Sequence, residues 1–234
     1  MINDPKIIII ALIGGIIPAL FWLWFWLKEA QENQEPKGLL AVCFILGMIS
    51  VIFVLPIQKF IQANIDLHQL KVISWASVEE IIKYLVVLAI IYKTRYSHRP
   101  IDWPIFMITA ALGFAALENT LFLIKPLSLN QATVSLLTGQ LRFLGSTLLH
   151  AVSSGIVGIA LGLSLNMELL GRRIFLFFGL ILAIALHSIF NFFIIENNGS
   201  NFLRVFAFLW VVTIIIMLLF EKLRRMNKKF NIAY

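Results

Sequence analysis

Seven runs of apolar residues, separated by short polar segments, dominate the pattern of hydrophobic and polar positions along the chain. Each run is roughly 20 residues long, which is the length that an α-helix needs to cross the hydrocarbon core of a bilayer. We therefore predict seven membrane-spanning helices in one integral membrane domain over residues 1–234, because the connecting segments are too short to form a further domain. The predicted spans are residues 7–27, 39–60, 74–92, 104–124, 141–165, 174–195 and 202–220.

The composition agrees with an all-α, polytopic transmembrane bundle and excludes a soluble globular domain. Apolar residues make up 60% of the chain and charged residues 13%, with a mean hydropathy of +0.93, whereas soluble domains are roughly 45–50% apolar. The single cysteine, Cys43, lies inside the second predicted span. One chain therefore has no means of forming an internal disulfide or a cysteine-rich metal site.

Basic residues are divided unevenly between the two ends of the predicted bundle. When the loops of a seven-span chain alternate between sides, twelve of the 19 Lys and Arg residues fall on the side of the C-terminus and six on the other side. The positive-inside rule then predicts an outside N-terminus and a cytoplasmic C-terminus. The net charge of +7 includes a basic tail at residues 222–229. We expect this tail to contact anionic lipid, so the charge requires no nucleic-acid partner.

Six ionisable residues interrupt the apolar runs on four consecutive predicted helices. A charge at the bilayer centre costs on the order of 2.5 to 3.5 kcal/mol on the insertion scale, so such residues are rare unless they have a function. Counted at about 1.5 Å per residue from the outer end of each span, the carboxylates and imidazoles lie about 7 to 12 Å deep. This shared depth predicts one polar pocket in the outer half of the bundle, with water access from outside. The residues are Glu79, Glu80, Lys83, Glu118, His150 and His187.

The spacing within the third span separates two adjacent carboxylates. Glu79 and Lys83 are four residues apart and share a helix face, while Glu80 points about 100° away. One carboxylate can then pair with Lys83 while the other faces the pocket, so the two can take different roles, as acid and base catalysis requires. The structural alternative is a buried salt bridge that joins two helices.

The other ionisable residues each have a polar neighbour on the same predicted helix. Polar side chains also join helices through hydrogen bonds in lipid, so each pair alone is compatible with a packing role. Their shared depth favours a common functional site instead. The pairs are Glu118 with Asn119, His150 with Ser154, and His187 with Asn191.

Two histidines and a carboxylate form the donor set of a zinc site that keeps an open position for water. The candidate ligands are His150, His187 and Glu118, which come from separate helices because the chain has no H-E-x-x-H motif. Such a metal lowers the pKa of its bound water and polarises a carbonyl group. In a metal-free alternative, Glu79 or Glu80 activates water as a general base and a histidine stabilises the oxyanion.

Taken in order, these motifs resemble the PrsW family of intramembrane proteases. That family is similar in turn to the CAAX-processing and bacteriocin-processing membrane endopeptidases and, more remotely, to the anterior-pharynx-defective subunit of γ-secretase. The matched core covers residues 74–191, and its motifs occur in the family's order on consecutive helices. They are Glu79-Glu80-x-x-Lys83, Phe114-x-x-x-Glu118-Asn119, His150 with its small neighbours, and His187-x-x-x-Asn191.

The resemblance implies proteolysis of membrane-tethered substrates, such as an anti-sigma factor cut on its outer side, in a bacterial plasma membrane. Lys83 stands one position before the usual arginine of the CAAX-type pattern, and Glu118 replaces a histidine, so the chain is closer to PrsW than to prenyl-protein processing. The implied active-site residues are Glu79, Glu80, Glu118, His150 and His187, with Lys83, Asn119, Asn191 and Ser154 in supporting roles.

Two other functional classes are compatible with ionisable residues inside membrane helices. A proton-coupled or ion-coupled transporter uses them to build an ion path that must reach both sides of the membrane, but the cytoplasmic halves of the predicted spans contain no ionisable residue. A non-catalytic scaffold can keep the fold of an enzyme without its activity. The complete set of carboxylates and histidines favours the protease.

Overall fold

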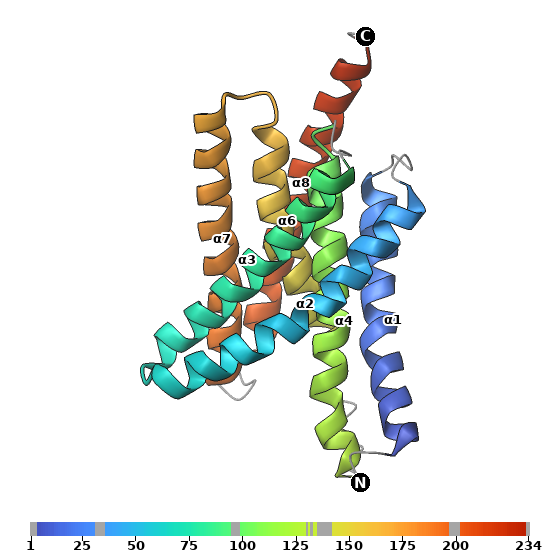
Figure 1. The fold of residues 1–234 in the computed structure, drawn as a ribbon, viewed down its shortest axis with the longest axis vertical. Helices are drawn as coiled ribbons and strands as arrows, with labels where there is room; N and C mark the ends of the chain where they lie inside the picture. The colour runs from blue at the N-terminus through green and yellow to red at the C-terminus, as the bar shows by residue number, and fades with distance from the viewer. Residues whose placement is uncertain are drawn as a thin grey trace.

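The structure of the protein is a computed structural model that describes residues 4–30, 36–94, 99–129, 131, 133–134, 142–196 and 202–232. Within these residues the fold is all-helical and contains seven long helices (Figure 1). A short π-helix, η1, leads directly into α6. The elements are α1 (Pro5–Ala30), α2 (Lys37–Asn64), α3 (His68–Thr94), α4 (Asp102–Ser128), η1 (Arg142–Ser146), α6 (Thr147–Leu163), α7 (Leu169–Glu196) and α8 (Phe202–Ile232).

Each predicted span corresponds to one helix, which confirms the predicted fold class. Most helices extend a few residues beyond the apolar run, and α3 begins at His68, six residues before the predicted start. The fifth span begins with η1, and its predicted first residue, Leu141, lies outside the described residues. Six of the helices are long and apolar enough to cross a membrane. The seventh, α3, carries the charged residues that interrupt its apolar run.

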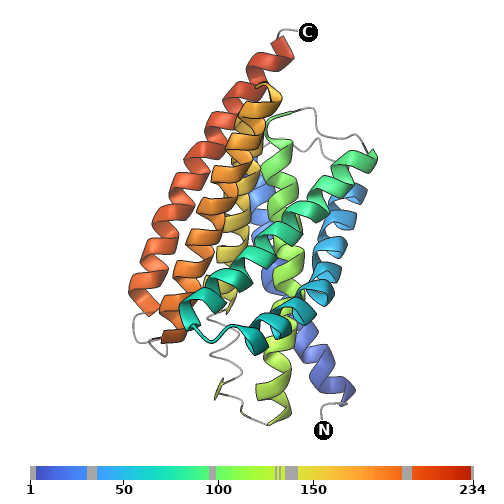
Figure 2. The ribbon, with the colours of Figure 1, turned by 60° about the vertical axis from the view of Figure 1, so that its left-hand side comes forward.

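The centre of the bundle is α4, which packs against α1, α2 and α6. Both α4 and α6 are buried along most of their length. The helices α2 and α3 form a V that crosses α4 obliquely, while α6, α7 and α8 stand together beside it (Figures 1 and 2). The site described below therefore lies where α3 meets α4, α6 and α7.

Glycines let α2 and α4 approach each other closely, which fixes the position of α2. A β-carbon added to Gly47 would overlap the carbonyl oxygen of Ala110, and one added to Gly113 would overlap the carbonyl oxygen of Phe44. Small residues at a crossing of membrane helices allow this kind of backbone contact. The crossing therefore anchors α2 to the central helix.

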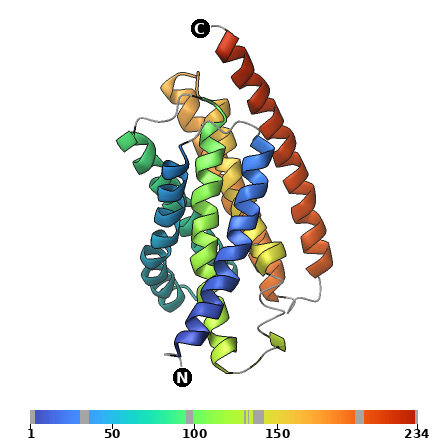
Figure 3. The same cartoon turned by 90° about the vertical axis from the view of Figure 1, so that its right-hand side faces the viewer.

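The two chain ends lie at opposite ends of the bundle, as an odd number of crossings requires (Figures 1 and 3). This arrangement is compatible with the predicted orientation. The assignment of the N-terminal end to the outside stays a prediction from the distribution of basic residues.

Candidate active site

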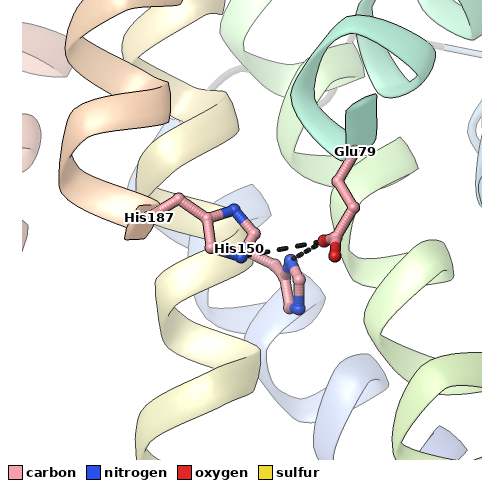
Figure 4. Close-up of side chains that lie close together, drawn as sticks. All are labelled: Glu79, His150 and His187. Carbon is pink, nitrogen blue, oxygen red and sulfur yellow. Dashed lines mark ion pairs between the residues drawn. The ribbon is translucent and has the colours of Figure 1, made fainter. Parts of the chain in front are cut away.

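Three side chains from three helices converge on one point of the buried interior (Figure 4). Glu79 of α3 directs its Oε2 atom toward both histidines, at 3.9 Å from His150 Nδ1 on α6 and 3.7 Å from His187 Nε2 on α7. The two imidazole rings are 5.0 Å apart and nearly perpendicular. All three side chains are almost fully buried. We call these three residues the Glu79 cluster.

Glu80 is buried next to the Glu79 cluster, and its carboxylate has four hydrogen-bonding partners. Lys83 Nζ donates to its Oε1 over 2.8 Å, and the hydroxyl groups of Ser153 and Ser154 donate over 3.1 and 2.6 Å. His187 Nδ1 lies 2.8 Å from the same Oε1. A buried carboxylate with four such partners is a satisfied acceptor. This network assigns the Nδ1 proton of His187 to Glu80 and leaves the lone pair of Nε2 facing Glu79.

His150 is held in a similar way by a second carboxylate. Its Nε2 atom lies 3.0 Å from Glu118 Oε2, and its Nδ1 atom lies 2.8 Å from Lys83 Nζ. Because an ammonium group only donates, Nδ1 accepts from Lys83, and the remaining proton of the ring points from Nε2 to Glu118. Histidines that bind metals commonly donate the N–H of their second ring nitrogen to a carboxylate in this way.

Lys83 is the positive counter-charge of the site. The side chain is completely buried, and its Nζ lies 2.8 Å from Glu80, 3.7 Å from Glu79 and 4.5 Å from the centre of the Phe114 ring. The predicted pairing of Lys83 with one carboxylate is thus present, but the closer partner is Glu80. Residues three apart and four apart both lie on one helix face, so tertiary packing decides between them.

Glu118 forms a second polar group with Arg142, at the start of η1. The guanidinium binds Glu118 Oε2 and Asn119 Oδ1, both at 2.5 Å, and packs 3.8 Å from the Phe122 ring centre. The Asn119 amide donates to the Thr147 hydroxyl over 2.8 Å. Glu118 is 20% exposed, whereas Glu79 and Glu80 are almost inaccessible. Glu118 is therefore the carboxylate of the site that is most open to water.

A cavity of about 530 Å³ leads to the Glu79 cluster. Glu79, His150 and His187 lie on its wall together with Glu118 and Asn191. The rest of the wall is mainly apolar and comes from α2 and α4, with polar groups among it. These other lining residues include Val51, Val54, Leu55, Gln58, Gln62, Trp75, Phe114, Leu121, Phe122, Arg142 and Ser146.

The structure brings together most of the residues that the sequence identified. Glu79, Glu80, Lys83, Glu118, His150, His187 and Ser154 form one connected network. Asn119 supports Arg142 and not a histidine. Asn191 lines the same cavity as His187, whose Nδ1 atom is bound by Glu80.

Two site residues were missed by the sequence argument. Gln58 of α2 donates its side-chain amide to Glu79 Oε1 over 2.9 Å, and Arg142 binds Glu118 as described. Both residues stand near the ends of predicted spans, where polar residues are ordinary. The spacing of Gln58 and Gln62, four apart on one helix face, was the available signal for a polar wall.

The Glu79 cluster fits a divalent metal with two imidazole ligands and one carboxylate ligand. One ligand atom from each residue lies within 4.8 Å of the others, and Glu79 Oε2 is buried without a hydrogen-bond partner. Ligand atoms around a tetrahedral zinc ion are about 3.4 Å apart, close to the observed 3.7 and 3.9 Å. Glu118, the carboxylate expected in this position from the sequence, lies instead at the opposite nitrogen of His150.

Comparison with known proteins gives consistent matches. Residues 35–220 match the model of the PrsW family of intramembrane metalloproteases. A "Protease PrsW" from Halalkalibacterium halodurans is 27% identical over 77% of this chain and 81% of its own length. Relatives of the same name from Shouchella clausii and Bacillus subtilis are 26% and 27% identical over 92% and 84% of this chain, and 96% and 89% of their own lengths. No solved structure gives a significant match.

The family match covers most of the chain, including α2, α3, α4, α6, α7 and the Glu79 cluster. Six apolar helices and the bacterial relatives place the protein in a bacterial plasma membrane. The named relatives identify its activity as that of a protease. The chain belongs to the PrsW family of intramembrane metalloproteases.

Proposed function

We propose that the Glu79 cluster holds one zinc ion and hydrolyses peptide bonds of membrane-tethered proteins, such as an anti-sigma factor. The observation that carries this proposal is the Glu79 Oε2 atom, which is buried, lacks a hydrogen-bond partner and faces two histidine nitrogens at the cavity wall. A zinc ion, when bound, would polarise the peptide carbonyl group and lower the pKa of water.

The residues around the Glu79 cluster orient the two histidine rings and transfer protons. Glu80 fixes the ring of His187 and Glu118 fixes the ring of His150, each through the nitrogen that faces away from Glu79. Glu118 is also partly exposed on the cavity wall. From this position behind the His150 ring, the carboxylate can take a proton from the attacking water through a further water in the cavity and return it to the leaving amine when the C–N bond breaks.

Lys83 sets a condition on metal binding. Its ammonium donates to His150 Nδ1, and one lone pair cannot serve both a hydrogen bond and a metal ion. The contact between Lys83 and His150 must therefore break when the site is loaded, while the bond from Lys83 to Glu80 can remain. In metal-free chemistry, the same Glu79 oxygen, which has no hydrogen-bond partner, would act as the general base, which is the second mechanism compatible with the site.

The cavity supports an extended apolar segment as the substrate. Its wall combines apolar residues of α2 and α4, such as Val51, Val54 and Phe122, with polar groups near the Glu79 cluster, so a peptide strand can contact the apolar part while its carbonyl group reaches the catalytic groups. With the predicted orientation, the cut falls in the outer half of the substrate's span.

A cleavage assay in proteoliposomes tests this function. We expect the purified protein to cut a single-span reporter, labelled at both ends, within the part of its span nearest the outer surface, as mapped by mass spectrometry of the products. The matched control is the double variant Glu79→Gln with His187→Gln, which removes one carboxylate and one imidazole of the Glu79 cluster and keeps a polar side chain at both positions. An intact reporter, or equal cutting by the double variant, would contradict the proposal.

A further inference from the structure

Gln58 is the one side chain of α2 for which the structure records a hydrogen bond to the Glu79 cluster. Its amide nitrogen donates to Glu79 Oε1 over 2.9 Å, and its own backbone carbonyl accepts a bond from Trp75 Nε1 over 3.3 Å. Residue 58 therefore joins α2 to α3 at two points, one of which is the carboxylate that faces the histidines.

The contact from Gln58 determines which oxygen of Glu79 faces the two histidines. Oε1 accepts the bond from Gln58, and Oε2 is left buried without a hydrogen-bond partner and directed at His150 and His187. A carboxylate that lost this bond would be free to rotate about its last side-chain torsion, because such torsions are broad and roughly two-fold. Neither of its oxygens would then be held between the two histidines, and the Lys83 ammonium 3.7 Å away would attract either oxygen.

The backbone that carries Gln58 is well anchored. The glycine contacts with α4 fix α2 near residues 44–47, and the Trp75 bond fixes it at residue 58 itself. The amide is thus presented to Glu79 from a rigid element. Functional groups must be held by a supporting layer of this kind to keep their geometry.

We propose that Gln58 is a positioning residue that aligns the Glu79 carboxylate for metal binding, an inference that rests on the proposed function. It extends the functional core from residues 74–191, where the sequence motifs lie, to include α2. Loss of the hydrogen bond to a ligating carboxylate lowers metal affinity or activity by about 10- to 100-fold in metalloenzymes. We expect loss of the Gln58 hydrogen bond to lower the zinc affinity of this protein by a factor within this range.

Zinc affinity and steady-state kinetics of Gln58→Met and Gln58→Asn test the inference. Methionine fills the space without a donor, and asparagine keeps the amide but is one methylene too short to reach Glu79. Both variants should bind zinc about 10- to 100-fold more weakly in a chelator competition and should lower kcat more than they change KM. Thermal unfolding without metal should stay one cooperative transition, lowered only by the loss of one hydrogen bond to buried Glu79, because the bond from Trp75 goes to the backbone and is retained.

Gln62→Met is the matched control, since Gln62 lies one turn along the same helix and lines the same cavity. It should keep zinc affinity within twofold of the parent value. Unchanged affinity in both Gln58 variants, or an equal loss in Gln62→Met, would overturn the positioning role. If the parent protein itself bound no zinc and still cut the reporter, the proposed metal site would fail instead, so the two failures are distinguishable.

Discussion

Glu79→Gln is expected to slow reporter cleavage by about 10³-fold or more, which corresponds to roughly 4 kcal/mol of lost transition-state stabilisation. Glutamine has nearly the shape of glutamate, and its carbonyl oxygen can still accept the bond from Gln58. The substitution removes the negative charge that faces the two histidines. Cleavage rate and zinc content measured on the same preparation should fall together.

A control for this variant is Glu168→Gln, which makes the same chemical change at an exposed position after α6. It should cleave at the parent rate. Cleavage by Glu79→Gln within tenfold of the parent rate would contradict a direct role of Glu79 in either the metal-dependent or the metal-free mechanism.

Glu80→Leu is expected to lower the free energy of unfolding by about 3–5 kcal/mol, the usual effect of breaking a buried ion pair. The substitution leaves the Lys83 ammonium without its closest carboxylate and removes the acceptor of His187, Ser153 and Ser154. Thermal unfolding in detergent, followed by circular dichroism, measures the loss. Glu80→Gln, which keeps an acceptor oxygen, should lose less.

A double-mutant cycle separates the charge from the packing. Glu80→Leu combined with Lys83→Met removes both members of the pair, so the double variant should be more stable than the sum of the two single effects predicts. Additive losses, or a Glu80→Leu variant as stable as the parent, would show that the pair does not stabilise the fold as the contacts indicate.

The fold was predictable because its main determinant is local. Runs of about 20 apolar residues can satisfy their backbone hydrogen bonds in lipid only as helices, so each run implied one helix. The helix ends were less predictable. The start of α3 at His68 includes Gln69 and Lys71, which interrupt the apolar run but continue the helix. Hydropathy measures the preference of a segment for lipid, and it does not show where the backbone hydrogen bonds of the helix begin and end.

The members of the site were also predictable, because ionisable residues inside apolar helices are costly and therefore few. Their pairing was not. Helix spacing favoured Glu79 as the partner of Lys83, whereas the closer contact of Lys83 is to Glu80. Helix spacing also gave no basis for deciding whether Glu79 or Glu118 lies between the two histidines. The crossing of α3 over α4 and α6 decides these contacts, and that crossing depends on packing between distant segments.

The same limit explains the residues that were missed. Gln58 acts on Glu79 across 21 positions of the chain, and Arg142 acts on Glu118 across 24. Neither relation has a local pattern. Only the three-dimensional arrangement shows that a polar residue near the end of a span belongs to the site.

Reconstitution of the metal-free protein with zinc is the most direct test of the metal site formed by Glu79, His150 and His187. The protein is stripped with a chelator, its residual metal is measured, and reporter cleavage in proteoliposomes is followed while zinc is added. We predict no cleavage without metal and a linear recovery that ends at one zinc ion per chain. Full cleavage by protein shown to contain no metal would contradict the metal site and would leave Glu79 as a general base.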